Sequence, residues 1–362
     1  MRVCHIVNNL SDTTMAGDLA IKQLNVGDVE RIDIVCWRGS NISIDHADVH
    51  VYDLSKNNST FLKKFMALNQ ILNKNDLIHV HHTVSGVLSS LIATPQRTPI
   101  VVTDHNSHHG YETHRLIVDN VTSRLANQVV CVSDSVRKSL DPWELKFVDK
   151  NKLSVIYNGV EPNRVNQAKK IDWSIDDYVD IDSGAMIVSS AGMLVEQKAQ
   201  HVLVDAVSEA NRESEIPIEL VISGSGRRKT ELSKRINHSD FSDHMHLLGF
   251  LPRREQVYKM MHESEVYAMP SLWEGFCVAA LEAMAAGNAC VFSDIDSFRP
   301  FHDVALLHQP GSVTELKNRL IQLAENPDKR QTLAQKSKEL VNKKYTIEKT
   351  AEEYNKLYKQ IV

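Results

Sequence analysis

Two glutamates stand in the segment PSLWEGFCVAALEAMAAG, residues 270–287, in surroundings that mark them for chemistry. Glu274 precedes a glycine in a predicted loop, and Glu282 follows among Ala, Leu, Val and Met. An apolar helix face seldom holds a carboxylate without a partner, so a solvated surface position suits Glu282 poorly. Each carboxylate can accept hydrogen bonds from vicinal hydroxyls, one set on a sugar and one on a ribose. The alternative is the acid and base of a glycosidase, but those must face one bond, whereas Glu282 lies about two helical turns further on.

Glycines end four of the predicted strands in the C-terminal half, and a lysine follows the first of them. The glycines are Gly192, Gly224 with Gly226, Gly249 and Gly275, and the lysine is Lys198. A glycine at a strand-to-helix turn lets the backbone approach a ligand, and the helix start that follows offers unpaired N–H groups to an anion. Each glycine alone also fits a tight turn, and Lys198 alone also fits a solvated surface lysine. Their repetition on consecutive turns favours a phosphate site, to which Lys198 would add a positive charge.

Apolar, β-branched runs alternate with helical patterns along most of the chain. The predicted strands cover residues 2–8, 31–37, 49–54, 77–82, 99–105, 128–133, 153–159, 185–192, 218–226, 244–250, 265–270 and 288–294. The clearest predicted helices cover residues 61–74, 84–94, 312–325, 328–343 and 347–361. This alternation is typical of βαβ units whose parallel sheets are buried on both faces.

A polar stretch at 161–184 interrupts the alternation, and we interpret it as an interdomain linker. The 362 residues suffice for two domains. We expect two Rossmann-like, doubly wound α/β domains, 1–165 and 166–345, and a C-terminal helix at 346–362 for which packing back on the first domain is one option. Ligands bind such sheets at the carboxyl ends of the strands, so we expect the two domains to share a cleft.

Composition narrows the class of protein. The net charge of −5, from 41 Lys and Arg against 46 Asp and Glu, excludes a generally basic nucleic-acid binder. Five scattered cysteines without a C-x-x-C pair predict reduced core residues. The N-terminus MRVCHIVNNL lacks the features of a signal peptide, and no apolar run approaches the ~20 residues of a membrane span. We therefore expect a cytoplasmic protein, with peripheral contact at the inner membrane surface left open.

The segment PSLWEGFCVAALEAMAAG resembles the glutamate–seven residues–glutamate motif of retaining nucleotide-sugar glycosyltransferases of family 4, whose GT-B fold has two facing Rossmann-like domains. AGMLVEQKAQHVLVDAV is similar to the phosphate segment of that family, VISGSGRRKTEL to its next glycine turn, and LGFLPRREQVYKMMHESEVYAMPSLWEGF to its base and sugar segments. IYNGVEP resembles the Asn-Gly turn before the linker, and HVHHTVSG with VVTDHN resembles the N-terminal cleft strands. The resemblance covers most of the chain.

The resemblance implies a role for each matching residue. Glu274 and His105 would hold the donor sugar, Lys198 would neutralise the departing diphosphate, and Glu282 would hold the ribose. Backbone groups would supply the remaining contacts to the sugar, the diphosphate and the base. They belong to Gly17, Gly192, Gly224, Gly226, Gly249, Phe250, Leu251, Phe276, Cys277 and Val278.

The resemblance also implies the partners. The donor would be a UDP- or GDP-sugar bound by the C-terminal domain, with no metal and no other cofactor. The N-terminal domain would bind a carbohydrate or lipid-linked acceptor, and nucleic acid is not expected. The donor sugar, the base and the acceptor stay open at this stage.

The chain departs from the family at several positions. Met193 stands where an Arg usually provides a second cation for the diphosphate, a charge-assisted contact worth about 1.5–3 kcal/mol. Ala199 and Cys277 each replace a customary Gly, and the N-terminal loop SDTTMAGDLA has only Gly17. Arg227 or Arg228 is a candidate for the missing charge.

Transfer with retention of configuration is the mechanism that these residues favour. No second carboxylate is placed as a nucleophile, so we expect same-face attack in which the departing diphosphate takes the acceptor proton, with the protein orienting the reactants and stabilising charge. Two alternatives remain: a sugar-nucleotide epimerase or hydrolase on the same fold, and a non-catalytic sugar-nucleotide-binding subunit, which Met193 favours.

Two further features have both a functional and a structural interpretation. The 17 histidines include clusters at His79, His81, His82 and at His105, His108, His109. His79 and His81 share a strand face, but no pattern supplies a third metal ligand, so local hydrogen bonding is favoured over a metal site.

The helix at 60–74 has Phe61, Phe65 and Leu68 beside two lysines. Packing of this helix on the sheet is favoured over contact with a membrane or a lipid.

Overall fold

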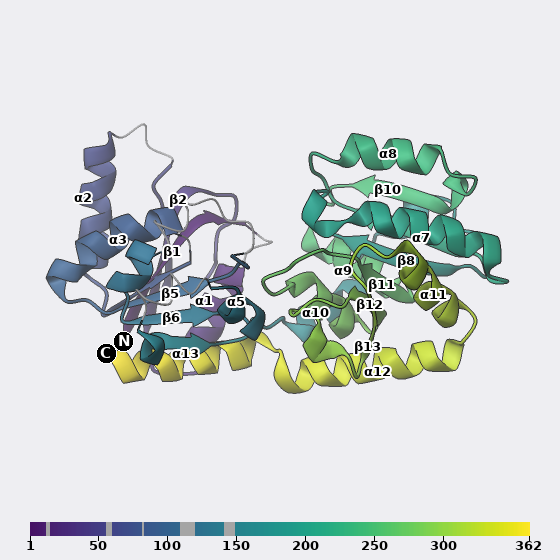
Figure 1. Ribbon diagram of the computed structural model, residues 1–362. Coiled ribbons are helices and arrows are strands. Elements are labelled where there is room, and N and C mark those ends of the chain that lie inside the picture. Colours follow the sequence, from purple (N-terminus) through teal and green to yellow (C-terminus); the bar gives the residue numbers. More distant parts are fainter. Residues whose placement is uncertain (12–14, 56–59, 82, 109–119, 141–148) are drawn as a thin grey trace. The chain divides into compact units, whose positions relative to one another are not determined.

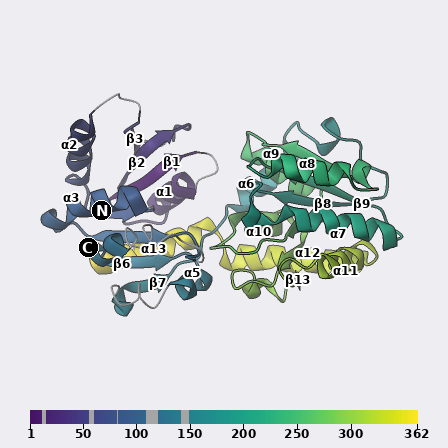
Figure 2. The same ribbon diagram turned by 45° about the horizontal axis from the view of Figure 1, so that its top comes forward.

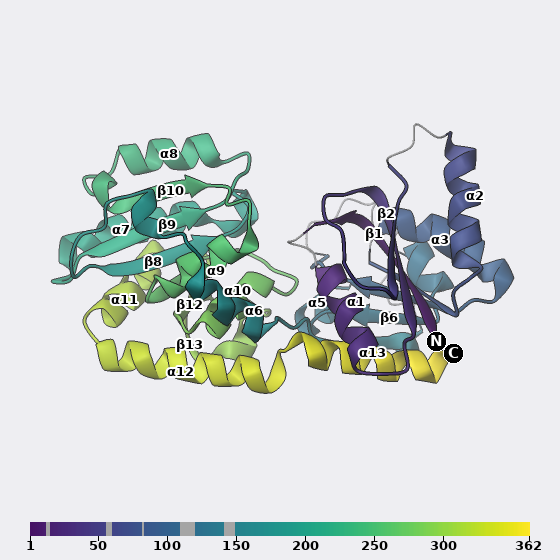
Figure 3. The same cartoon turned by 180° about the vertical axis from the view of Figure 1, so that it is seen from behind.

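The computed structural model describes residues 1–11, 15–55, 60–81, 83–108, 120–140 and 149–362. The described residues form two compact units (Figure 1). Unit 1 lies within Met1–Gly159 and Ile347–Val362, and unit 2 is Val160–Thr346. The chain therefore leaves unit 1, builds unit 2 and returns to unit 1 with its last helix. The N- and C-termini lie close together in unit 1 in the three views (Figures 1, 2 and 3).

Unit 1 is built on a parallel sheet with the strand order β3-β2-β1-β4-β5-β6-β7. Its strands are β1 (Arg2–Leu10), β2 (Arg31–Ser40), β3 (Val49–Asp53), β4 (Leu77–Val80), β5 (Ile100–Asp104), β6 (Gln128–Cys131) and β7 (Leu153–Val155). Its helices are α1 (Met15–Asn25), α2 (Phe61–Leu72), α3 (Thr83–Gln96), α5 (Asp134–Ser139) and α13 (Ile347–Ile361). The strand order reverses between β1 and β4, which pair in parallel.

Two apolar clusters cover the two faces of this sheet. One joins α1 and α13 to the strands, and the other joins α2 and α3 to them. Helix α13 belongs to the first cluster through its apolar face, on which Ala351, Tyr354 and Tyr358 are buried. The C-terminal helix thus packs on the N-terminal sheet, because burying that apolar stripe removes it from water.

Unit 2 repeats the architecture with the strand order β10-β9-β8-β11-β12-β13. Its strands are β8 (Met186–Ala191), β9 (Ile218–Ser223), β10 (Met245–Gly249), β11 (Val266–Met269), β12 (Ala289–Ser293) and β13 (Ala305–His308). Its helices are α6 (Pro162–Gln167), α7 (Gln200–Glu213), α8 (Lys229–Asn237), α9 (Arg254–His262), α10 (Val278–Ala286), α11 (Val313–Ala324) and α12 (Pro327–Lys344). Helices α7, α8 and α11 share one large apolar cluster with the strands. Every strand pairing in the described chain is parallel.

The interpretation of residues 161–184 as a linker is wrong. This stretch begins with α6, continues in short 3₁₀ turns and belongs to unit 2. Four of its apolar side chains, Val165, Ala168, Trp173 and Ile175, are buried. Arg164 forms an ion pair with Glu255 of α9 at 2.8 Å. A polar composition concealed this packing because the buried residues are widely spaced.

Strand β13 was not predicted. It is an edge strand of four residues, Ala305–His308, that pairs only with β12 among the described strands. By contrast, all five cysteines are buried, as the sequence predicted.

Two glycine turns of unit 2 pack directly against each other. A Cβ on Gly224 would lie 1.9 Å from the carbonyl oxygen of Gly192, and a Cβ on Gly226 would lie 2.4 Å from that of Leu194. The turns after β8 and β9 are therefore in backbone contact. Gly224 and Gly226 are needed here for that contact, whether or not a ligand also approaches.

We expect Gly224→Ala to destabilise unit 2 by about 3 kcal/mol or more, because neither backbone can move aside. Gly311→Ala is the matched control, since Gly311 also has a positive φ, +77°, but has no atom within 4 Å of its Cβ position. The control is expected to cost only ~1–2 kcal/mol from backbone conformation. Urea denaturation measures both changes, and equal losses would contradict the clash.

Candidate active site

The carboxyl ends of β8 and β11 lie side by side in unit 2. The two strands pair in parallel at the point where the strand order of the sheet reverses. Ligands of doubly wound sheets bind at such a switch point. The turn after β8 carries Lys198, and the loop after β11 carries Glu274. The topology thus brings together two predicted site residues that lie 76 positions apart in the chain.

Lys198 and Glu274 form a buried ion pair. The Lys198 Nζ donates to Glu274 Oε1 at 2.6 Å, and the two side chains are only 14% and 7% exposed. The neighbouring Gln197 holds the loop in place, because its carbonyl accepts from the Leu272 N–H at 2.8 Å and its side chain donates to the Trp273 carbonyl at 2.9 Å. The alternative of a solvated surface lysine is therefore excluded.

The charge of Lys198 depends on this pairing. Burial alone lowers the pKa of Lys198, but the opposing effects of Cys277 and Glu274 exceed it, and the net pKa lies above its ordinary value. Burial raises the pKa of the Cys277 thiol to about 11, although Lys198 opposes the rise. Because that thiol is neutral near pH 7, the Glu274 carboxylate is the group that forms the ion pair with Lys198.

Helix α10 begins beside this pair. Its N-cap is Cys277, whose side chain accepts no hydrogen bond from the first turn. The Cys277 Sγ lies 3.8 Å from Lys198 Nζ and 3.0 Å from Met269 Sδ. Its φ of −84° suits any residue, so the replacement of the customary Gly introduces no backbone strain. Phe276 is buried, with its ring 6.0 Å from that of Tyr345.

Glu282 also has partners, and the sequence did not identify them. On α9, Arg254 donates from Nε to Glu282 Oε1 at 2.8 Å and contacts it again through a second nitrogen, while Tyr258 Oη donates at 2.8 Å. The side chains of Arg254 and Glu282 are 10% and 8% exposed. Burial and then Glu282 raise the pKa of Tyr258. The one available signal was the spacing of Arg254 and Tyr258, which places both on one face of a helix.

The predicted glycines differ in what surrounds them. Gly192 has a φ of +152°, and its Cβ position lies 3.7 Å from the Lys198 side chain. The Gly249 carbonyl accepts from the Gly224 N–H at 2.8 Å, so the turns after β9 and β10 are also joined. Beyond it, Phe250 is 63% exposed and Leu251 is buried. In unit 1, Gly17 lies in the first turn of α1, where a Cβ would be 3.3 Å from Ile44.

Of the two candidates for the missing cation, Arg228 is already engaged. It forms an ion pair with Glu231, and its guanidinium lies 3.2 Å from His201 Nδ1. Arg227 is exposed, as is Met193, whose side chain is 62% exposed in the turn after β8.

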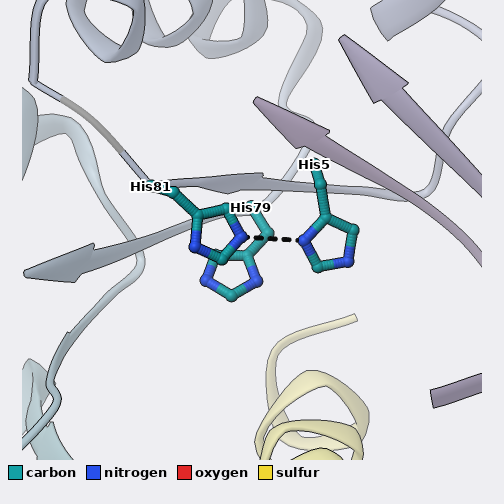
Figure 4. A group of neighbouring side chains, drawn as sticks. All are labelled: His5, His79 and His81. Atoms are coloured by element: carbon teal, nitrogen blue, oxygen red, sulfur yellow. Dashed lines mark hydrogen bonds between the residues drawn. The ribbon is translucent and has the colours of Figure 1, made fainter. Parts of the chain in front are cut away.

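His105 follows β5 in unit 1 and contacts a group of buried histidines. Its Nε2 lies 3.2 Å from His81 Nδ1. His79 lies on β4, His81 directly follows that strand, and His5, which sequence patterns did not select, lies on the neighbouring β1 (Figure 4). His108 instead contacts Asp104. His82 and His109 lie outside the described residues.

The three buried histidines also have the spacing of a metal site. His5, His79 and His81 each offer a ring nitrogen, and these atoms lie within 4.8 Å of one another. The same nitrogens make hydrogen bonds, however: His5 Nδ1 lies 2.9 Å from His81 Nε2, and His79 bonds to Thr103 and Tyr358. A metal would have to replace those bonds. The prediction that no metal is bound stays a prediction.

Two doubly wound parallel sheets of this kind make up the GT-B fold. A family model described as "Glycosyl transferases group 1" matches residues 172–340, and one described as "Glycosyltransferase Family 4" matches residues 31–164. The chain belongs to the GT-B glycosyltransferases, and the match to family 4 lies in its N-terminal half. Among the described residues, every helix is too short or too polar to span a lipid bilayer.

Other proteins are similar to this chain in sequence or in fold. An uncharacterized glycosyltransferase of Methanocaldococcus jannaschii is 26% identical over 333 residues, which cover 84% of each chain. The UDP-Gal:alpha-D-GlcNAc-diphosphoundecaprenol alpha-1,3-galactosyltransferase of Escherichia coli is 26% identical over 248 residues, covering 65% of this chain and 62% of that one. The crystal structure of HepE from Anabaena in complex with UDP-glucose has a TM-score of 0.81 at 18% identity, covering 99% of this chain and 100% of that one.

We expect the Lys198–Glu274 pair to show strong coupling in a double-mutant cycle. Lys198→Met or Glu274→Gln alone should cost about 3 kcal/mol or more of unfolding free energy, because each leaves a buried group without its partner. The double variant should lose much less than the sum. Urea denaturation measures all four proteins, and additive losses would show that the pair is not a unit.

Proposed function

We propose that this protein transfers a sugar from a UDP- or GDP-sugar to a carbohydrate or lipid-linked acceptor, with retention of the anomeric configuration. One observation carries the proposal: a buried cation, Lys198, held by Glu274 at the switch point of the unit 2 sheet, beside the start of α10. A negatively charged diphosphate matches both the cation and the positive end of the helix dipole at the start of α10.

Each donor group has an assigned partner in this proposal. Lys198 and the N–H groups of residues 276–278 take the diphosphate, and Glu274 takes sugar hydroxyls. Glu282, oriented by Arg254 and Tyr258, takes the ribose, and the exposed ring of Phe250 offers a face to the base. His105 of unit 1 is assigned to the same sugar.

The reaction is proposed as same-face attack. The acceptor oxygen forms the new bond to the anomeric carbon as the bond to the diphosphate oxygen breaks, and the departing diphosphate takes the acceptor proton. Lys198 stabilises the negative charge that develops on the leaving group, an electrostatic effect that is strong where water is excluded. Orientation of the two reactants supplies the rest of the rate.

A lipid-linked acceptor has support from one relative. The galactosyltransferase of Escherichia coli carries UDP-Gal as donor and a diphosphoundecaprenol-linked sugar as acceptor in its name. We infer an acceptor of similar chemistry, a sugar on a lipid diphosphate, for this chain.

Lys198→Ala is expected to lower the rate of transfer roughly 10- to 150-fold, because a charge-assisted contact to the leaving group is worth about 1.5–3 kcal/mol. Lys317→Ala is the matched control, since the Lys317 side chain is also only 11% exposed and is paired with a glutamate of unit 2, Glu213, at 2.7 Å. Product is measured with a panel of nucleotide sugars and a diphospho-lipid-linked sugar acceptor.

Three outcomes would contradict this proposal. Equal activity of the Lys198→Ala and control proteins would remove Lys198 from the chemistry. Turnover of the donor without acceptor would favour a hydrolase or epimerase. Donor binding by thermal shift without any turnover would favour a non-catalytic subunit, the alternative that the exposed Met193 supports.

We also propose peripheral membrane contact through the start of α2. This helix buries Leu68, Ile71 and Leu72 in unit 1, so the sheet-packing interpretation holds for its second half. Its first half instead exposes large apolar side chains beside Lys63 and Lys64. Phe61 is 67% exposed, Leu62 65% and Met66 54%. Apolar side chains flanked by lysines suit the interface of an anionic bilayer.

Replacing Phe61 and Leu62 together by serine should weaken binding to vesicles of phosphatidylglycerol and phosphatidylcholine roughly tenfold or more, because two large apolar side chains leave the interface. Vesicle sedimentation measures the partition. The control is Tyr178→Ser, which removes an exposed aromatic side chain, 52% exposed, from unit 2. Unchanged binding of the double variant would exclude this surface.

A further inference from the structure

The buried histidines of unit 1 are part of a continuous hydrogen-bonded path that ends at His105. Gln23 Oε1 on α1 lies 2.9 Å from His5 Nε2, His5 Nδ1 lies 2.9 Å from His81 Nε2, and His81 Nδ1 lies 3.2 Å from His105 Nε2. Gln23, His5 and His81 are 0%, 0% and 6% exposed. The path therefore runs through the interior of unit 1.

A branch of the same network reaches α13. Gln23 Nε2 donates to Tyr358 Oη at 3.1 Å, and Tyr358 Oη lies 2.5 Å from His79 Nδ1. On the far side of that ring, His79 Nε2 lies 2.7 Å from Thr103 Oγ1. Tyr358 therefore accepts from the amide nitrogen of Gln23, which turns the amide oxygen of Gln23 toward His5.

We propose that Gln23, oriented by Tyr358, sets which ring nitrogen of His105 carries the proton, with His5 and His81 as the positioning residues between them. This inference deepens the proposed function, since it concerns the state of His105, the residue assigned to the donor sugar.

Neutral imidazole has one N–H and one lone pair, so each neutral ring donates through one nitrogen and accepts at the other. Burial lowers the pKa of His5 to about 4, against a smaller upward effect of its bond to Gln23, and burial also lowers the pKa of His79. His5 is therefore neutral near pH 7. In a chain of neutral rings, a proton placed on one ring nitrogen determines the donor in every following bond.

The direction of the chain starts at Gln23. Its amide oxygen can only accept, so His5 donates from Nε2 and accepts at Nδ1. His81 must then donate from Nε2, and a neutral His81, which is buried at 6% exposure, accepts at Nδ1, so that His105 donates from Nε2. A neutral His105 therefore has its lone pair on Nδ1, the form that accepts a hydrogen bond from a sugar hydroxyl. Turning the Gln23 amide over would reverse each of these bonds and place the proton on Nδ1.

The network also explains why these polar groups are buried together. Each bond satisfies a group that would be costly to bury alone. Three strands and two helices contribute to it, so the state of His105 is tied to the packing of α1 and α13 on the sheet. A metal held by His5, His79 and His81 would need the lone pairs that this chain uses, and the two alternatives therefore exclude each other.

The test is the tautomer of His105, observed in two-bond ¹H–¹⁵N spectra of the full chain labelled with ¹⁵N-histidine. His105→Gln assigns the signals of this ring. In the unaltered protein we expect the proton on Nε2. Gln23→Met and Tyr358→Phe, each close in volume to the residue replaced, should convert His105 to a mixture of tautomers. If the two tautomers of His105 are equally populated in a variant, its kcat/KM for transfer should fall about 2-fold. The value should fall further as the Nδ1–H tautomer predominates.

Thr350→Val is the matched control. Thr350 is buried on α13 and donates to the Tyr157 carbonyl at 2.9 Å, so the variant loses a buried hydroxyl of the same helix without altering the path. Its His105 spectrum should match that of the unaltered protein.

The inference is overturned if both relay variants fold and keep the Nε2 tautomer, or if the unaltered protein carries the proton on Nδ1. Stoichiometric Zn²⁺ binding that shifts the ring signals of His5, His79 and His81 would also overturn it. If His105→Gln transfers sugar normally, the proposed role of His105 fails, whereas the spectra still decide whether the relay exists.

Discussion

A charge that is removed from water must meet an opposite charge or be neutralised by gaining or losing a proton, and unit 2 is organised around this constraint at its switch point. Lys198 and Glu274 satisfy each other at 2.6 Å between the turns that follow β8 and β11. The pair therefore joins two strand ends and keeps a cation at the place where a doubly wound sheet binds its ligand. Glu282 meets the same requirement through Arg254 and Tyr258. Both glutamates of the motif are thus held in one orientation before any ligand arrives, which lowers the entropy cost of binding.

Unit 1 meets the requirement in a different way. Its buried polar groups at the corresponding switch point, between β1 and β4, are imidazole rings, hydroxyls and an amide, and burial lowers the pKa of the His5 and His79 rings. Such a network has no net charge to compensate, but it has a direction, because each bond needs one donor and one acceptor. A protein that uses His105 toward a sugar would gain from a fixed tautomer, since only one of the two presents an acceptor at Nδ1.

The alternation of apolar runs and helical patterns predicted twelve strands close to their observed positions, because strands buried on both faces are continuous runs of apolar residues. The same rule did not find β13, and it failed at 161–184, where widely spaced apolar side chains pack in unit 2 within a polar sequence. Sequence patterns also selected Glu274, Glu282 and Lys198. They did not reveal Arg254, Tyr258 or His5, whose importance comes only from the residues that the fold places beside them.

The amino-acid sequence by itself determined the parallel α/β architecture, the two-domain organisation and the chemical types at the candidate site, because periodicity and turn residues act over a few positions of the chain. The tertiary structure decided which groups form hydrogen bonds and ion pairs with one another. Lys198 meets Glu274 across 76 positions, and Gln23 meets Tyr358 across 335. Those contacts depend on strand order and on the return of α13 to the N-terminal sheet, and no local pattern encodes either. The physical reason is that a pKa or a tautomer is set by the few ångströms around a group, whatever the distance along the chain.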